Sequence, residues 1–80
     1  MYRYELKFFR GRETVETVAF SKDVLEEVIR HYLDLFCLMN SRLRKKEFYK
    51  IMRFVNGTEK GHFRDNFIEI NVKRRCFNGI

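Results

Sequence analysis

The chain has 80 residues, a net charge of +6, nine phenylalanines and no proline. Its length fits one small domain, and its aromatic content argues against intrinsic disorder, which requires low hydrophobicity. Its apolar runs are too short to cross a membrane or to form the core of a secretory signal, so we expect a cytoplasmic protein. In that compartment the two cysteines, Cys37 and Cys76, are expected to be reduced.

Residues 2–20 are expected to form an antiparallel hairpin. From Tyr2 to Phe9, large apolar residues alternate with charged ones, which is typical of a strand with one buried face. Gly11 in the following turn accepts a positive φ. Residues 14–20 are rich in β-branched side chains, which favours a returning strand.

The next segment, residues 21–39, is expected to be a helix. Ser21 can cap its N-terminus, and apolar residues recur at helical spacing as far as Met39. The last five residues, from Leu35 to Met39, are all apolar, so a helical turn made of them would need cover on every side. Because a symmetric partner or the second helix could supply that cover, we expect Leu35, Cys37 and Leu38 at or beside a homodimer interface, or else under the second helix.

A second helix is predicted from Ser41 to about Val55, after a break at Asn40 and before a C-cap at Gly57. On a wheel with about 100° per residue, its apolar residues gather on one side. Glu47 is the only acidic residue of this predicted helix. The opposite side carries a basic stripe, which we define as Arg42, Lys45, Lys46, Tyr49, Lys50 and Arg53.

The C-terminal part is expected to complete a sheet. Residues 67–76 alternate as a strand does, and residues 61–64 can form a short strand that pairs with it. The expected order is β-β-α-α-β, with one more edge strand if residues 61–64 pair. The natural arrangement is an α+β fold in a single domain, residues 1–80, with a small antiparallel sheet and two helices packed on one face.

Charge is distributed unevenly along the chain. Residues 1–40 have a net charge of −1, and residues 41–80 a net charge of +7. Uncompensated cations along one helix face suit a phosphate backbone, so the main hypothesis is a non-enzymatic protein that binds nucleic acid or a ribonucleoprotein. A basic surface that only keeps the protein in solution is the competing interpretation. The expected contacts are the basic stripe together with Arg10, Arg12, Lys73 and Arg75.

The alternative function is a small inhibitor or adaptor that binds a protein partner, of the kind that viruses and mobile elements encode. Enzyme activity is not expected. Glu27 and Asp34 lie about one helical turn from His31 and could tune a general base, but a solvated helix face explains them as well, and His62 has no second catalytic group at a set distance. A metal or other cofactor is not expected either. The possible zinc ligands, both histidines and both cysteines, lack the close spacing of zinc sites.

Residues 17–29, TVAFSKDVLEEVI, resemble the strand and first helix of ribbon-helix-helix repressors. In that family the strand pairs across a dimer and its outward side chains read the major groove, which would place Thr17 and Ala19 at the bases. The resemblance covers about a sixth of the chain and consists of common residue types. The chain departs from the family in its longer first helix, in the missing glycine at that helix end and in the extra strands around this unit.

Overall fold

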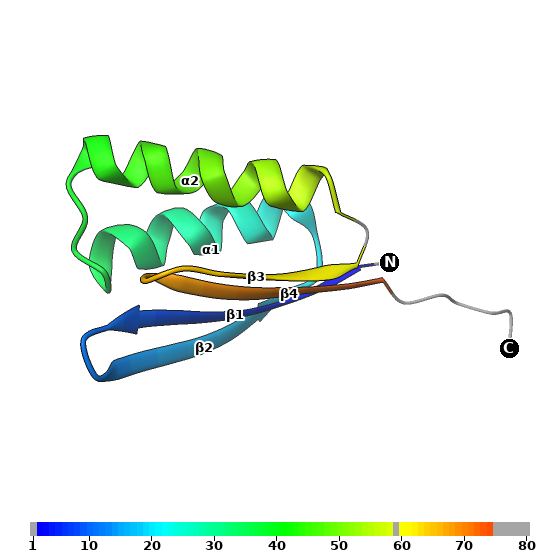
Figure 1. The fold of residues 1–80 in the computed structure, drawn as a ribbon, viewed down its shortest axis with the longest axis horizontal. Coiled ribbons are helices and arrows are strands. Elements are labelled where there is room, and N and C mark those ends of the chain that lie inside the picture. Colours follow the sequence, from blue (N-terminus) through cyan, green and yellow to red (C-terminus); the bar gives the residue numbers. More distant parts are fainter. Residues whose placement is uncertain (1, 59, 75–80) are drawn as a thin grey trace, which may run out of the picture.

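The computed structural model describes residues 2–58 and 60–74. It has two layers, a four-stranded sheet and a pair of helices that cover one face of it (Figure 1). The predicted α+β fold is confirmed, with the short strand at residues 61–64 present as a sixth element. The elements are β1 (Tyr2–Arg10), β2 (Glu13–Ala19), α1 (Lys22–Leu35), α2 (Ser41–Asn56), β3 (Gly61–Arg64) and β4 (Ile68–Arg74).

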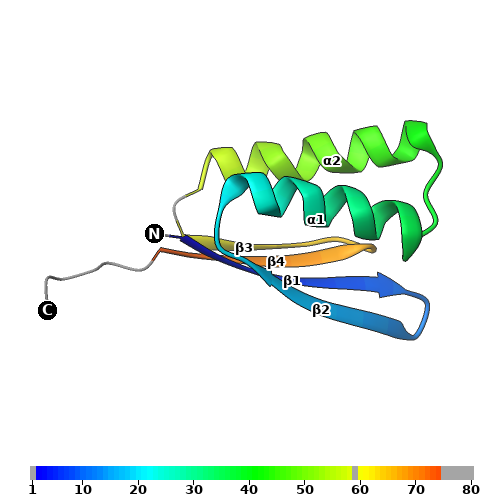
Figure 2. The ribbon, with the colours of Figure 1, turned by 180° about the vertical axis from the view of Figure 1, so that it is seen from behind.

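The sheet has the strand order β2-β1-β4-β3, and every neighbouring pair is antiparallel. The N-terminal strand β1 and the C-terminal strand β4 therefore pair at the centre of the sheet, seen from behind in Figure 2. Leu6 lies opposite Thr17 on β2 and Ile70 on β4. Each hairpin thus places one strand in the centre and one at an edge.

The core lies between the helices and one face of this sheet. Tyr4, Leu6 and Phe8 of β1 are buried, while their neighbours along the strand are only partly buried. This alternation confirms the period of two seen in the sequence. The other elements contribute the buried residues Ala19, Leu25, Ile29, Leu33, Ile51, Met52, Val55, Ile68, Ile70 and Val72.

The strand that resembled a repressor ribbon is part of this intramolecular sheet. β2 pairs with β1 of its own chain, so it does not pair across a dimer through that edge. Ala19 is fully buried, and Thr17 shares its face of β2, toward the helices. The placement of Thr17 and Ala19 at the bases, which the resemblance implied, is therefore wrong.

The expectation of a buried helical turn from Leu35 to Met39 is also wrong. α1 ends at Leu35, and the residues that follow form a loop in which Leu38 has a φ of +55°. The Met39 amide donates to the carbonyl of Leu33 at 3.0 Å, and the Met39 side chain is buried. Leu35 and Leu38 point outward and are 62% and 60% exposed. In a loop, consecutive apolar side chains can point to the core or to solvent independently. These residues therefore do not need to be buried on every side, as a helical turn of them would.

Asn40 then starts the second helix. Its side-chain oxygen accepts a hydrogen bond from the Leu43 amide at 2.9 Å, as an N-cap does. The α1–α2 connection lies at the same end of the molecule as the β1–β2 hairpin, and the start of β1 and the end of β4 lie at the other end (Figures 1 and 2). At that connection the Cys37 thiol, which burial holds at a raised pKa, donates to the carbonyl of Phe9 at 3.6 Å.

Two residues that the sequence singled out, Arg75 and Cys76, lie outside the described residues. No helix in the described ranges is both long and apolar enough to span a membrane.

The left-handed backbone at Leu38 gives a test of the loop. We expect Leu38→Asn to raise the free energy of unfolding by about 0.5–1 kcal/mol, because asparagine tolerates this conformation better than leucine and the exposed side chain loses little packing. Urea denaturation of both proteins measures the difference. A destabilised variant would mean that the Leu38 side chain packs against the fold.

Candidate functional site

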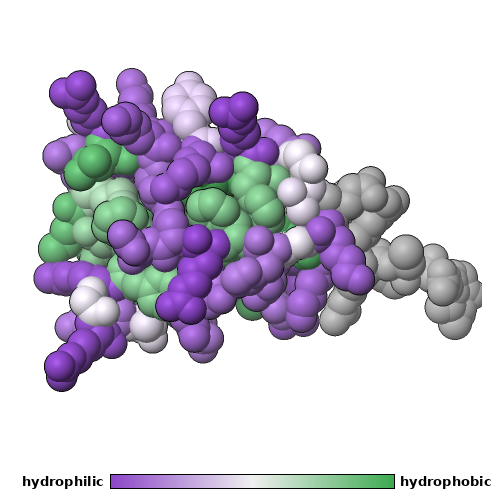
Figure 3. All heavy atoms as spheres, in the orientation of Figure 1, coloured by the Kyte–Doolittle hydropathy of each residue, from purple (hydrophilic) through white to green (hydrophobic). Residues whose placement is uncertain are grey.

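The outer face of α2 collects the side chains of the basic stripe. Ile51, Met52 and Val55 turn one side of the helix into the core. Burial of that side leaves the residues about 180° away in solvent, and five of the six residues of the stripe are largely exposed there without a carboxylate beside them. Figure 3 shows hydrophilic side chains gathered along the rim above α2. The apolar side and the basic side that the helical wheel predicted are therefore both present in α2.

Four cations of the stripe form no ion pair within the described part of the chain. We call Arg42, Lys45, Lys46 and Arg53 the cationic row. The row covers about three turns, roughly 16 Å along the helix axis. The first turn of α2 contains no acidic residue, so cations stand at the positive end of the helix dipole, where they destabilise the helix by a few tenths of a kcal/mol each.

Lys50 also belongs to the basic stripe but not to the cationic row, because its charge is already neutralised. Its Nζ lies 3.2 Å from Glu47 Oε1 and 2.9 Å from Asp65 Oδ2. These contacts raise the pKa of Lys50 and turn the ammonium toward the β3–β4 turn. Arg44, on the other side of α2, is likewise held by Asp34 at 2.9 Å. The nearby acids are thus used by these two residues and not by the row.

The carboxyl of Glu47 is buried, although the residue belongs to a charged segment. The side chain is only 6% exposed, and its Oε2 has no hydrogen-bond partner among the described residues. Burial, followed by the neighbouring Asp65, raises the pKa of Glu47 to about 7. Asp65 accepts hydrogen bonds from the Phe67 and Ile68 amides at 2.8 and 3.0 Å, and its pKa is lowered. The cluster ties α2 to the β3–β4 turn.

The sheet face that the helices leave open carries acids next to most of its cations. Glu5 lies between Arg3 at 3.1 Å and Lys73 at 3.0 Å, and the Lys73 contact lowers the pKa of Glu5. Lys7 pairs with Glu16 at 3.6 Å, and His62 lies 2.7 Å from Glu69. Lys73, a predicted contact, therefore lies on the opposite side of the sheet from α2 and is paired there.

The other predicted contacts lie at the hairpin tip. Arg10 and Arg12 are exposed on either side of Gly11, whose φ of +58° makes the turn. This tip is at the end of the molecule where α2 begins, but it continues the sheet layer and not the helical layer (Figure 1). The predicted footprint is thus not one continuous surface, and its densest part is α2.

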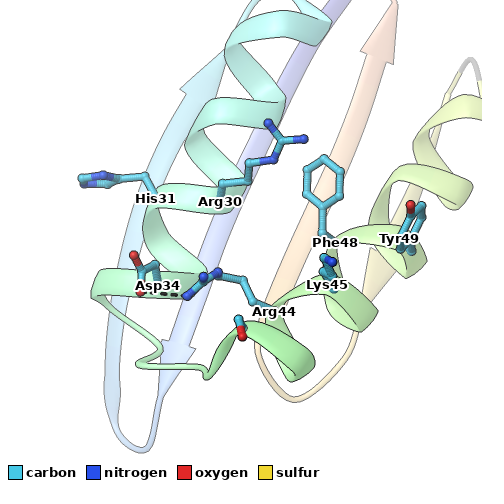
Figure 4. A pocket seen from close by; sticks show the side chains of 8 residues that line it. Arg30, His31, Asp34, Arg44, Lys45, Phe48 and Tyr49 are labelled. Carbon is cyan, nitrogen blue, oxygen red and sulfur yellow. Dashed lines mark hydrogen bonds and ion pairs between the residues drawn. The ribbon is translucent and has the colours of Figure 1, made fainter.

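A groove of about 540 Å³ runs between α1 and α2 beside the cationic row. Figure 4 shows Arg30 of α1 directed toward Phe48 of α2, and the guanidinium carbon lies 4.5 Å from the ring centroid. His31 also lines the groove, although its ring points away from Phe48 (Figure 4). Tyr49 stands at the groove's outer edge and is 72% exposed.

The two histidines come from different layers, His31 from the outer helical layer and His62 from the open sheet face. His31 packs edge-on against Tyr32, with ring centroids 5.2 Å apart. No group of three or more histidine, cysteine, aspartate or glutamate side chains is placed to hold a metal ion within residues 2–58 and 60–74.

Exposed apolar residues gather where α1 passes into α2, at the left of Figure 3. Leu35 and Leu38 belong to this apolar end, and Leu43 and Phe67 line a neighbouring cleft of about 370 Å³ with Lys46. Cys37, which the sequence placed at a dimer interface, is half-buried. The geometric argument for that interface, a helical turn needing cover on all sides, no longer holds, so the homodimer stays a prediction.

Comparison with known proteins adds no relative. The chain matches no protein-family model, and searches of curated proteins and of solved structures found no significant similarity.

The buried Glu47 makes stability depend on pH. Because its folded pKa of about 7 exceeds the ordinary value of 4.5, the native state binds more protons between those values, and stability should fall as pH rises from about 4.5 to about 7. Glu47→Gln, which mimics the protonated acid, should remove that fall. At pH 8 the variant should be more stable than wild type by on the order of 2 kcal/mol.

Urea denaturation across pH 4.5–8 measures the effect. The control Glu27→Gln, at an exposed position of α1, should keep the wild-type slope of stability against pH. Parallel slopes for wild type and Glu47→Gln would contradict the burial of this carboxyl.

Proposed function

We propose that the protein binds nucleic acid, free or in a ribonucleoprotein, through the outer face of α2. The observation that carries this proposal is the cationic row, Arg42, Lys45, Lys46 and Arg53, exposed without a partner acid in the described chain. Protein cations that contact phosphates release condensed counterions, which supplies most of the affinity for a nucleic acid backbone. A row of this kind on a rigid helix is suited to that contact.

The contrast with the open sheet face supports this choice of surface. That face also carries cations, but Glu5 and Glu16 pair with Arg3, Lys7 and Lys73. On α2 the only carboxyl is that of Glu47, which is buried and forms an ion pair with Lys50. The excess positive charge of residues 41–80 is thereby concentrated on the helical layer. Lys50, which is already paired, and Lys73 are left out of the proposed contact.

Removing the row should change the salt dependence of binding. We expect the triple variant Arg42→Gln, Lys46→Gln and Arg53→Gln to stay folded, because these side chains are exposed. Its slope of log affinity against log salt concentration should be shallower by about two to three, since each phosphate contact contributes about 0.9. Fluorescence anisotropy with a labelled DNA, titrated at several salt concentrations, measures both slopes.

A second triple variant, Lys7→Gln, Arg64→Gln and Lys73→Gln, is the matched control. It removes the same charge from the open sheet face and should keep nearly the wild-type slope. If the slope of log affinity against log salt concentration fell equally in the two variants, binding would depend only on net charge. A normal slope without the row would place the contact elsewhere.

The apolar end favours a second candidate, a protein partner. Leu35 and Leu38 expose large side chains there, and Lys46 borders the cleft that Leu43 and Phe67 line. An acidic protein would complement this surface, as expected of the inhibitor or adaptor alternative. A second copy of the chain would bring two cationic rows together.

Sedimentation equilibrium at micromolar concentration separates these occupants. A dimer formed through the apolar end should tighten as salt rises, because salt screens the repulsion between the two basic surfaces, and Leu38→Glu should dissociate it. The mass of one chain at every salt concentration would rule out the homodimer and leave an acidic partner as the remaining occupant.

A further inference from the structure

The groove between α1 and α2 has an aromatic wall beside the cationic row. Its volume, about 540 Å³, lies within the range of small-ligand sites, about 300–1,000 Å³. Phe48 forms part of the wall, and Tyr49 stands at its edge with ring planes at 71° and centroids 6.5 Å apart. The cationic row needs no aromatic groove to bind phosphates. The groove therefore suggests that the ligand has another group, one that contacts aromatic side chains.

The charges of the groove are also those of a nucleic acid site. Arg30, Arg44 and Lys45 line it, against one acid, Asp34. Asp34 is neutralised by Arg44 at 2.9 Å, so it does not repel an anion strongly. The Arg30 guanidinium carbon lies 4.5 Å from the centroid of the Phe48 ring, so this wall already holds one cationic, planar group against an aromatic ring.

Tyr49 is the most exposed of the large apolar or aromatic side chains in the described chain, at 72%. It lies between Lys45, Lys46 and Arg53 on the helix, three or four residues away in sequence. An aromatic ring placed among phosphate-binding cations is the arrangement on which single-stranded nucleic acids stack their bases. The bases of a duplex are paired and stacked inside, so they do not reach such a ring.

We propose that the groove binds an unstacked base of single-stranded nucleic acid, which stacks on Tyr49 and enters toward Phe48 and Arg30, while the cationic row holds the flanking phosphates. The proposal rests on the function proposed above and names its substrate class. It predicts a preference for single strands that the cationic row alone would not give. A cationic row acting alone would bind a duplex at least as tightly as a single strand, because the duplex has the higher charge density.

The test compares a labelled oligothymidylate, which does not pair with itself, with a mixed-sequence duplex of the same length by fluorescence anisotropy. Wild type should bind the single strand more tightly. Tyr49→Ala should weaken single-strand binding about tenfold, as loss of one stacked base does, with an unchanged salt slope. Tyr49→Phe, which keeps the ring, should bind like wild type, and duplex binding should change less than twofold in either variant.

Leu43→Ala is the matched control, because it shortens another exposed side chain of α2 that lies outside the groove. It should leave both affinities unchanged. Duplex binding equal to or tighter than single-strand binding, or a Tyr49→Ala variant with wild-type affinity, would overturn the base site while leaving the phosphate contact intact. Absence of salt-dependent binding to either probe would instead overturn the proposed function, and the base site with it.

Discussion

The apolar face of the sheet has to be kept from water by only two helices, and the arrangement of the charges depends on that constraint. Tyr4, Leu6 and Phe8 on β1 and Ile68 and Ile70 on β4 form a continuous buried surface. Both helices must turn their apolar sides toward it, because a small domain has no other layer to use. The outer side of α2 is then fixed in orientation, and its cations all face solvent.

The same constraint separates the molecule's charges into two environments. The buried layer lies between α2 and the acids of the open sheet face, so Glu5 and Glu16 pair with cations of their own face and Glu69 contacts His62 there. On the helical side, Glu47 is withdrawn into the contact with Lys50 and Asp65. Much of the basic character of the second half of the chain thus lies on the outer side of α2. That surface supports the nucleic acid hypothesis better than net charge alone.

Much of this was predictable from periodicity. Alternation along residues 2–9 identified the buried face of β1, and the helical wheel of residues 41–55 separated the side that packs from the side that is solvated. Five apolar residues in a row, Leu35–Met39, carry no such period. Their composition could not distinguish a helical turn from a loop, and the hydrogen bond from Met39 to Leu33 that decides it depends on the folded chain.

The burial of Glu47 was missed for a related reason. Its partner Asp65 lies in the β3–β4 turn, and only the tertiary fold brings the two together. The wheel did hold a signal, because Glu47 falls about 40° from Ile51 and hence on the apolar half of α2. The groove was beyond prediction as well, since Arg30 meets Phe48 only when the two helices pack side by side.

The central claim is that nucleic acid contacts the outward face of α2. The most direct measurement is a map of amide chemical-shift changes on adding a short single-stranded oligonucleotide to isotope-labelled protein. We expect the largest changes at Arg42, Lys46 and Tyr49, with smaller ones at Arg30 across the groove. Changes centred on His62, Arg64 and Lys73 of the open sheet face, or a spectrum that does not respond, would contradict it.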